Sequence, residues 1–220
     1  MKKILFFILI SISLGSFAND KEYSDKMASY AAIFEFSPIK GNIESAVQVF
    51  NYDTESLPFQ GIRLSLSPNG CIDAIEMIKK TNENNEDRVK LYRINNNLVF
   101  NKDIKGKFKE EMYLLDSSCN IIKDLKNNIN YTYENNLINT VTKNGEIIKR
   151  FKFNNKNQLT DIIFNKLIQP KNDMMKLLTN TDVECTDFDI NKNPLTCSTL
   201  SERSNSSRKL IMTSIYNYYE

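Results

Sequence analysis

The sequence of 220 residues contains no histidine and no tryptophan, and only six glycines and five prolines. The absence of histidine excludes Ser-His-Asp triads, Cys-His dyads, histidine-ligated metal sites and histidine pH switches. Glycine and proline normally supply many turns. Here asparagine, with 29 residues, is abundant enough to make many of them, because its side chain tolerates the left-handed backbone conformation.

Residues 1–18 have the pattern of a secretory signal peptide. Lys2 and Lys3 form a charged start, an apolar run of about ten residues follows, and Ser16 and Ala18 are small residues before a cleavage point between Ala18 and Asn19. The apolar run is shorter than the roughly 20 residues of a membrane span. We therefore predict a periplasmic product that is soluble after cleavage. Membrane association through an uncleaved segment is the alternative.

The charge of the mature chain gives no indication of a polyanionic partner. Cleavage removes two of the 29 basic residues and none of the 27 acidic ones, so the mature chain is formally neutral. A neutral surface of mixed sign does not steer nucleic acid or anionic lipid toward a protein. We therefore predict no nucleic-acid partner.

Four cysteines in an exported chain indicate two disulfides. Cys185 and Cys197 flank a turn around Asn193 and Pro194, which favours a bond across a hairpin. Cys71 and Cys119 each follow a turn-like string and then pair by elimination, although four cysteines allow three connectivities. No C-x-x-C spacing is present, so we predict structural disulfides and no metal site.

Segments of alternating polarity dominate from about residue 32 onward. Most are joined by short Asn, Asp, Ser or Gly clusters, and Asn144-Gly145 is a strong signal for a type I′ hairpin. We predict a mainly β domain over residues 19–220, an antiparallel meander of repeated hairpins that forms a curled sheet or a sandwich-like body. Few helices are expected, at 21–32 and 167–178. A strand is expected at 33–36 and hydrophilic loops at 81–87 and 201–208.

A diffuse repeat emerges when the turns are aligned. Its unit is an aromatic strand, an Asn/Asp turn and an apolar residue that opens the next strand, as in 91–98 and 131–137. This pattern is similar to the YD repeats of bacterial surface and toxin-shell proteins. The pairs Tyr131/Tyr133 and Phe151/Phe153 each share one face of a strand, and polar neighbours on the other face favour core packing over a ligand-stacking stripe.

Several segments together resemble the YnfC family of uncharacterised bacterial envelope lipoproteins. They are 27–30, 34–41, 69–73, the 185–197 stretch with its Asn-Pro, and the aromatic end at 215–219. The resemblance implies an exported protein of unknown function with a lipid anchor. Lipidation needs a cysteine directly after the apolar run, and Ser16 stands there instead. We therefore predict no lipid anchor.

The candidates for chemistry are acidic pairs and serine–lysine spacings. Glu110 and Glu111 are adjacent, and Asp182, Glu184, Asp187 and Asp189 gather around Cys185. The series Asp187, Asp189, Asn191, Asn193 resembles the start of a calcium loop, but Lys192 and Ser198 stand where that loop needs Gly and Glu. The S-x-x-K spacings at Ser37–Lys40 and Ser206–Lys209 fall in turn-like composition, where no helix brings lysine onto serine.

These observations favour a non-enzymatic envelope protein that binds or scaffolds another envelope protein, with no cofactor and no catalytic residue assigned. The alternative is a carboxylate-dependent periplasmic hydrolase of cell-wall or glycan material, which would need two acids about 5–10 Å apart in a cleft. A small-ligand binder inside a curled sheet is a third interpretation, and it requires an apolar cavity with few polar groups.

Overall fold

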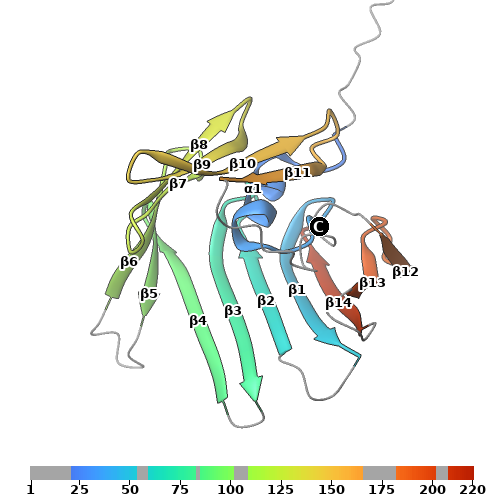
Figure 1. Cartoon of the computed structure of the whole chain (residues 1–220). Helices are drawn as coiled ribbons and strands as arrows, with labels where there is room; N and C mark the ends of the chain where they lie inside the picture. Colours follow the sequence, from blue (N-terminus) through green and yellow to red (C-terminus); the bar gives the residue numbers. More distant parts are fainter. Residues whose placement is uncertain (1–20, 54–58, 83–84, 102–108, 166–181, 202–207) are drawn as a thin grey trace, which may run out of the picture.

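The computed structural model of the chain describes residues 21–53, 59–82, 85–101, 109–165, 182–201 and 208–220. Within them it contains one helix, α1 (Asp25–Phe34), and fourteen strands in a single sheet (Figure 1). The predicted signal sequence, its cleavage point at Ala18–Asn19 and the helix predicted at 167–178 lie outside the described residues.

The sheet is an antiparallel meander with one return. From β1 to β11 each strand pairs with the next, and β14 then pairs with the free side of β1, so that β11 and β12 are the two terminal strands. The prediction of a curled antiparallel sheet is confirmed. The strands are β1 (Ile43–Tyr52), β2 (Phe59–Leu66), β3 (Ile72–Asn82), β4 (Asn85–Ile94), β5 (Asn97–Asn101), β6 (Lys109–Leu115), β7 (Ile121–Asp124), β8 (Ile129–Glu134), β9 (Leu137–Lys143), β10 (Glu146–Phe153), β11 (Leu159–Phe164), β12 (Val183–Phe188), β13 (Pro194–Ser201) and β14 (Arg208–Tyr218).

The sheet curves around α1, which lies inside the curve with β8–β11 above it (Figure 1). A helix enclosed in this way needs apolar or small residues on nearly every side. Seven of the ten residues of α1 are buried, and Tyr30 is only 1% exposed. The inward faces of the strands complete the core around Tyr30, with Leu64, Ile75 and Leu91 essentially without exposure.

Asparagine makes many of the turns, as the composition predicts. Of the eleven non-glycine residues with positive φ in the described part of the chain, six are Asn. Asn144 and Gly145 have φ values of 52° and 83°, the two positive angles that a type I′ turn requires. Asn135 and Asn136, with φ values of 52° and 66°, make a second turn of this kind without glycine.

Two boundary predictions are wrong. The first helix begins only at Asp25, because the Ser24 hydroxyl caps it by accepting the Met27 N–H at 3.1 Å. It continues to Phe34, through the first half of the strand predicted at 33–36. The predicted loop 81–87 is shorter than expected, because β3 continues to Asn82 and β4 begins at Asn85. Pairs such as Lys79–Asp87 continue the antiparallel ladder toward the end of this hairpin, because main-chain hydrogen bonding does not require apolar side chains.

Both disulfides are present with the pairing that the sequence favours. Cys185 and Cys197 are directly opposite each other on β12 and β13. Cys71 and Cys119 join the turn before β3 to the turn before β7.

The tyrosines and phenylalanines that the sequence assigns to the core pack there. Phe151 is buried, and Tyr133 packs against the core and donates to the Ile121 carbonyl at 2.9 Å.

Candidate functional site

The two terminal strands of the sheet line one pocket of about 610 Å³, which we call the edge groove. Its apolar lining comes from three distant parts of the chain: the segment around α1, the start of β11, and the β12–β14 region. The apolar residues are Tyr23, Pro38, Leu159, Val183, Phe188, Pro194 and Met212, together with the Cys185–Cys197 disulfide. Phe188 leaves 56% of its surface exposed, which is unusual for a large aromatic residue.

The polar side of the edge groove carries one close ion pair. The Lys40 ammonium lies 2.6 Å from the Glu22 carboxylate and 5.8 Å from the centre of the Tyr23 ring. Glu22 also accepts a hydrogen bond from the Gln158 amide, which ties this segment to the turn before β11. Burial, with the Glu22 charge beside it, raises the pKa of Tyr23 well above its ordinary value, so the phenol stays neutral.

Two buried side-chain amides hold the 37–40 segment against the groove. Gln48 on β1 accepts the Ser37 N–H and donates to the Ser37 carbonyl, both at 2.9 Å. Asn193 accepts the Lys40 N–H at 2.7 Å and donates to the Lys40 carbonyl at 2.9 Å. Each amide therefore replaces the partner strand that this segment lacks, which satisfies main-chain groups that would otherwise be costly to bury.

The residues of the calcium-like series form a turn. The Asp189 carboxylate accepts the main-chain N–H groups of Asn191 and Asn193 at 2.9 and 2.7 Å, and the Tyr218 hydroxyl donates to its second oxygen. Burial, with the bond to Asp189, raises the pKa of Tyr218 to about 12. Within the described ranges no group of three or more His, Cys, Asp or Glu residues is placed to hold a metal ion.

The other predicted candidates do not come together. Glu110 and Glu111 are neighbours in β6, so their side chains point to opposite faces. Lys40 is paired with Glu22, while the main chain of Ser37 is bonded to Gln48. Ser206 lies outside the described residues.

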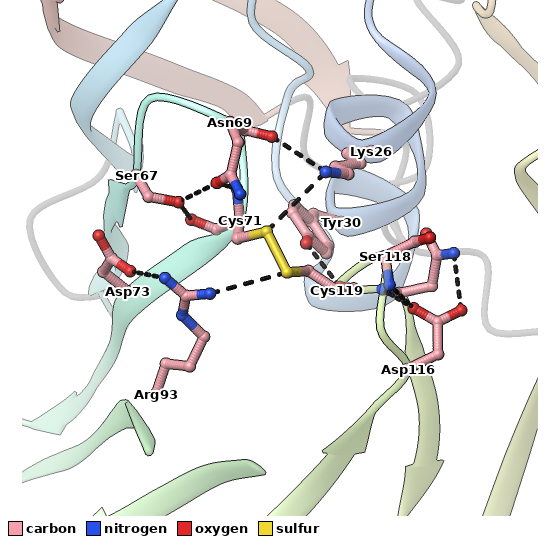
Figure 2. Close-up of a disulfide and its surroundings, with 11 residues drawn as sticks. Lys26, Tyr30, Ser67, Asn69, Cys71, Asp73, Arg93, Asp116, Ser118 and Cys119 are labelled. Carbon is pink, nitrogen blue, oxygen red and sulfur yellow. Dashed lines mark hydrogen bonds and ion pairs between the residues drawn. A yellow bond between two sulfur atoms is a disulfide. The ribbon is translucent and has the colours of Figure 1, made fainter. Parts of the chain in front are cut away.

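A second unusual environment surrounds the Cys71–Cys119 disulfide. The Lys26 ammonium, on α1, lies 3.8 Å from the Cys71 sulfur, and the Arg93 guanidinium, on β4, lies 3.7 Å from the Cys119 sulfur. Figure 2 shows the two cations approaching the bond from opposite sides. Arg93 also pairs with Asp73 at 2.5 Å.

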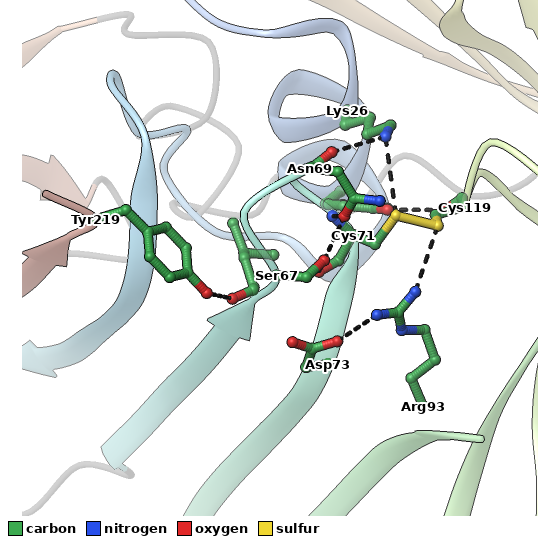
Figure 3. Close-up of polar contacts among 10 residues, drawn as sticks. Lys26, Ser67, Asn69, Cys71, Asp73, Arg93, Cys119 and Tyr219 are labelled. Atoms are coloured by element: carbon green, nitrogen blue, oxygen red, sulfur yellow. Dashed lines mark hydrogen bonds and ion pairs between the residues drawn. A yellow bond between two sulfur atoms is a disulfide. The ribbon is translucent and has the colours of Figure 1, made fainter. Parts of the chain in front are cut away.

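The turns that carry these cysteines are held by their own side chains and by α1. Lys26 donates to the Asn69 carbonyl at 2.9 Å, and Tyr30, one turn further along the helix, donates to the Cys119 carbonyl at 2.7 Å. Figure 3 shows that Tyr219 holds the same region from the C-terminal side, by donating to the Leu66 carbonyl. A pocket of about 550 Å³ lies beside this disulfide, and its lining includes Lys26, Asn69, Gly70, Ser118 and Asn120.

Sequence reasoning found the four cysteines but neither environment around them. Phe188 and Ile190 stand in an acidic, asparagine-rich turn, and apolar residues in such a place are a signal that was available. Lys26 and Arg93 are 45 and 26 residues away from the cysteines they approach, so no local spacing indicates them.

No protein-family model matches the chain, and no curated protein matches it. Among solved structures it is similar to a porin-like protein from Bacteroides uniformis ATCC 8492, with 8% identity and a TM-score of 0.48, over 80% of this chain and 98% of that one. A likeness at this level does not indicate function. None of the helices in the described ranges has the length and apolar character to span a membrane. The two disulfides fit a chain that folds in an oxidising, exported compartment.

Proposed function

We propose that this chain is an exported, non-enzymatic binding protein of the bacterial envelope, and that the edge groove takes an extended segment of a partner protein. The observation that carries the proposal is that both terminal strands, β11 and β12, line the same pocket. The signal-like residues 1–18 and the two disulfides support the exported location.

An extended polypeptide suits this groove better than a compact ligand. In the described part of the chain β11 pairs only with β10 and β12 only with β13, so each presents one row of main-chain N–H and C=O groups without a strand partner. A guest strand that bonds to such an edge gains affinity from its main chain, and pockets beside the edge select its side chains. The exposed ring of Phe188 would be covered by an apolar side chain of the guest.

The alternative hydrolase receives no specific support. Glycoside hydrolysis needs two carboxyl groups facing one cleft. Among the residues that the structure describes, Glu22 is the one carboxylate in the lining of the edge groove, and Asp25 is the one in the lining of the 550 Å³ pocket. Glu22 is paired with Lys40, and Asp25 with Lys21 at 2.7 Å, so both are engaged in holding the N-terminal segment in place.

Photocrosslinking in living cells tests the proposal. A benzoylphenylalanine is placed at position 188, in the groove, or at position 190, where the native side chain is 93% exposed and outside the groove lining. We expect a discrete protein adduct at 188 and little at 190, and we expect the crosslinked partner peptide to be an apolar segment. The variant Phe188→Ala should lose the partner while Ile190→Ala keeps it.

Two results would contradict the proposal. Equal labelling at 188 and 190 would mean that the groove has no special role. Adducts at 188 that contain lipid or a small molecule in place of protein would replace the extended-segment hypothesis with the small-ligand interpretation. Neither variant removes a buried side chain, so the fold is preserved in both, and circular dichroism of the purified variants checks this.

A further inference from the structure

The two disulfides of this chain have different electrostatic surroundings. In the described residues, Cys71–Cys119 has a cation within 4 Å of each sulfur, and no such contact is present at Cys185–Cys197. A thiolate beside a lysine or arginine is stabilised, and a stabilised thiolate is the better leaving group when a disulfide is attacked. The surroundings of Cys71–Cys119 therefore favour cleavage of that bond over the other.

We propose that the Cys71–Cys119 disulfide is a thiol–disulfide exchange site that accepts two electrons from a dithiol, while Cys185–Cys197 is a permanent structural bond. The expected point of attack is Cys119, because it is partly exposed, whereas Cys71 is only 1% exposed. The residues on either side of Cys119, Ser118 and Asn120, line the adjacent 550 Å³ pocket, which leaves room for an incoming thiol.

The exchange proceeds in two balanced steps. The thiolate of the dithiol attacks the Cys119 sulfur, which forms a mixed disulfide and releases Cys71 as a thiolate next to the Lys26 ammonium. The second thiol of the reagent loses its proton to solvent and attacks the reagent's first sulfur, which is bonded to Cys119 in the mixed disulfide. This releases Cys119 as a thiolate next to Arg93, the reagent leaves as a disulfide, and the protein has gained two electrons.

The reduced pair remains in position for reoxidation, because α1 holds both turns without the bond. Lys26 binds the Asn69 carbonyl, and Tyr30 binds the Cys119 carbonyl (Figure 2). Asp116 accepts the main-chain N–H groups of Ser118 and Asn120, both at 2.8 Å, which fixes the turn of Cys119 from within.

The two cations differ in how far a nearby carboxylate neutralises their positive charge. The contacts described for the Lys26 ammonium are a carbonyl and a sulfur, and neither carries an opposing charge. Arg93 is partly neutralised by its ion pair with Asp73 (Figure 3), and the Asp73 side chain is 43% exposed. Removing the Lys26 charge should therefore slow exchange, and removing the Asp73 charge should accelerate it by freeing Arg93 to act on Cys119.

The test compares the two disulfides within one molecule. The purified oxidised protein is exposed to dithiothreitol, or to reduced thioredoxin as a protein dithiol, and samples are quenched with acid, alkylated and mapped by mass spectrometry. We expect Cys71–Cys119 to be reduced about tenfold faster than Cys185–Cys197. A larger ratio of the two reduction rates with thioredoxin than with dithiothreitol would identify a protein as the natural reagent, and a smaller ratio a small dithiol.

The variants give the decisive readings, because the ratio of the two rates cancels any general loss of stability. Lys26→Gln should lower the ratio about threefold, Lys26→Arg should restore it, and Asp73→Asn should raise it. An equal rate for both disulfides in the unaltered protein overturns the proposal. So does a ratio that Lys26→Gln and Asp73→Asn leave unchanged.

Discussion

Asn193 is predicted to be the most important single side chain for holding the edge groove together. Its side chain has no exposed surface, and it makes three hydrogen bonds: two with the main chain of Lys40 and one to the Tyr218 hydroxyl at 2.7 Å. A hydrogen bond between neutral groups contributes about 1 kcal/mol to stability, and more when a buried partner is left unpaired. We therefore expect Asn193→Ala to lower the free energy of unfolding by about 3 kcal/mol.

The assay is equilibrium unfolding in urea, followed by circular dichroism at neutral pH. The midpoint should fall at constant slope, because the change removes contacts and leaves the surface exposed on unfolding unaltered. Asn193→Asp keeps the acceptor oxygen for the Lys40 N–H but loses both amide donors, so it should also be strongly destabilising. Asn155→Ala, at an exposed position in the β10–β11 turn, is the control and should change stability by less than about 0.5 kcal/mol. A loss below about 1 kcal/mol for Asn193→Ala would refute the reasoning.

Three further predictions follow from buried groups. Burial, with the nearby Asp124 charge, raises the pKa of Tyr113 to about 12, so above pH 10 the unfolded phenol ionises while the folded one stays neutral. Between pH 10 and 12 this group alone should contribute up to about 1.4 kcal/mol per pH unit to the fall in stability. Urea midpoints at pH 8 and 11 should therefore fall less steeply in Tyr113→Phe, and an equal fall in both proteins would contradict the assignment. The buried Ser29 hydroxyl accepts the Ile138 N–H at 3.0 Å, so Ser29→Ala should cost about 1–3 kcal/mol and speed hydrogen exchange at the Ile138 amide; unchanged exchange there would contradict the assignment. Replacing the cysteine pair 71/119 by serine should lower the free energy of unfolding by about 4 kcal/mol, and replacing the pair 185/197 should lower it by about 3 kcal/mol, because the first disulfide closes the longer loop. The reverse order in urea unfolding would count against the chain-entropy explanation.

The sheet was predictable because the sequence patterns that specify it lie within single strands and the turns that join them. Alternation of polar and apolar residues, interrupted by Asn-rich turns, is enough to identify successive antiparallel hairpins such as the one at Asn144-Gly145. The end of α1 was less predictable, since Ile33 to Phe36 fits a short strand and a last helical turn equally well, and burial of Phe34 against the ring of Tyr113 decides for the helix. The pairing of β14 with β1 joins residues about 170 positions apart, and no local pattern indicates it.

The candidate sites were the least predictable part, because each depends on one long-range pairing. Once β14 lies beside β1, the β12–β13 hairpin is carried to the segment at 37–40, where the Asn193 amide finds the main chain of Lys40. In the sequence Asn193 stands in a calcium-like spacing, but in the structure its amide is bonded to the main chain of Lys40 and to the Tyr218 hydroxyl. The same logic applies at Cys71, since Lys26 reaches its sulfur only because the sheet curls around α1. Composition and spacing therefore identify which residues can act, and the curvature of the sheet decides which of them meet.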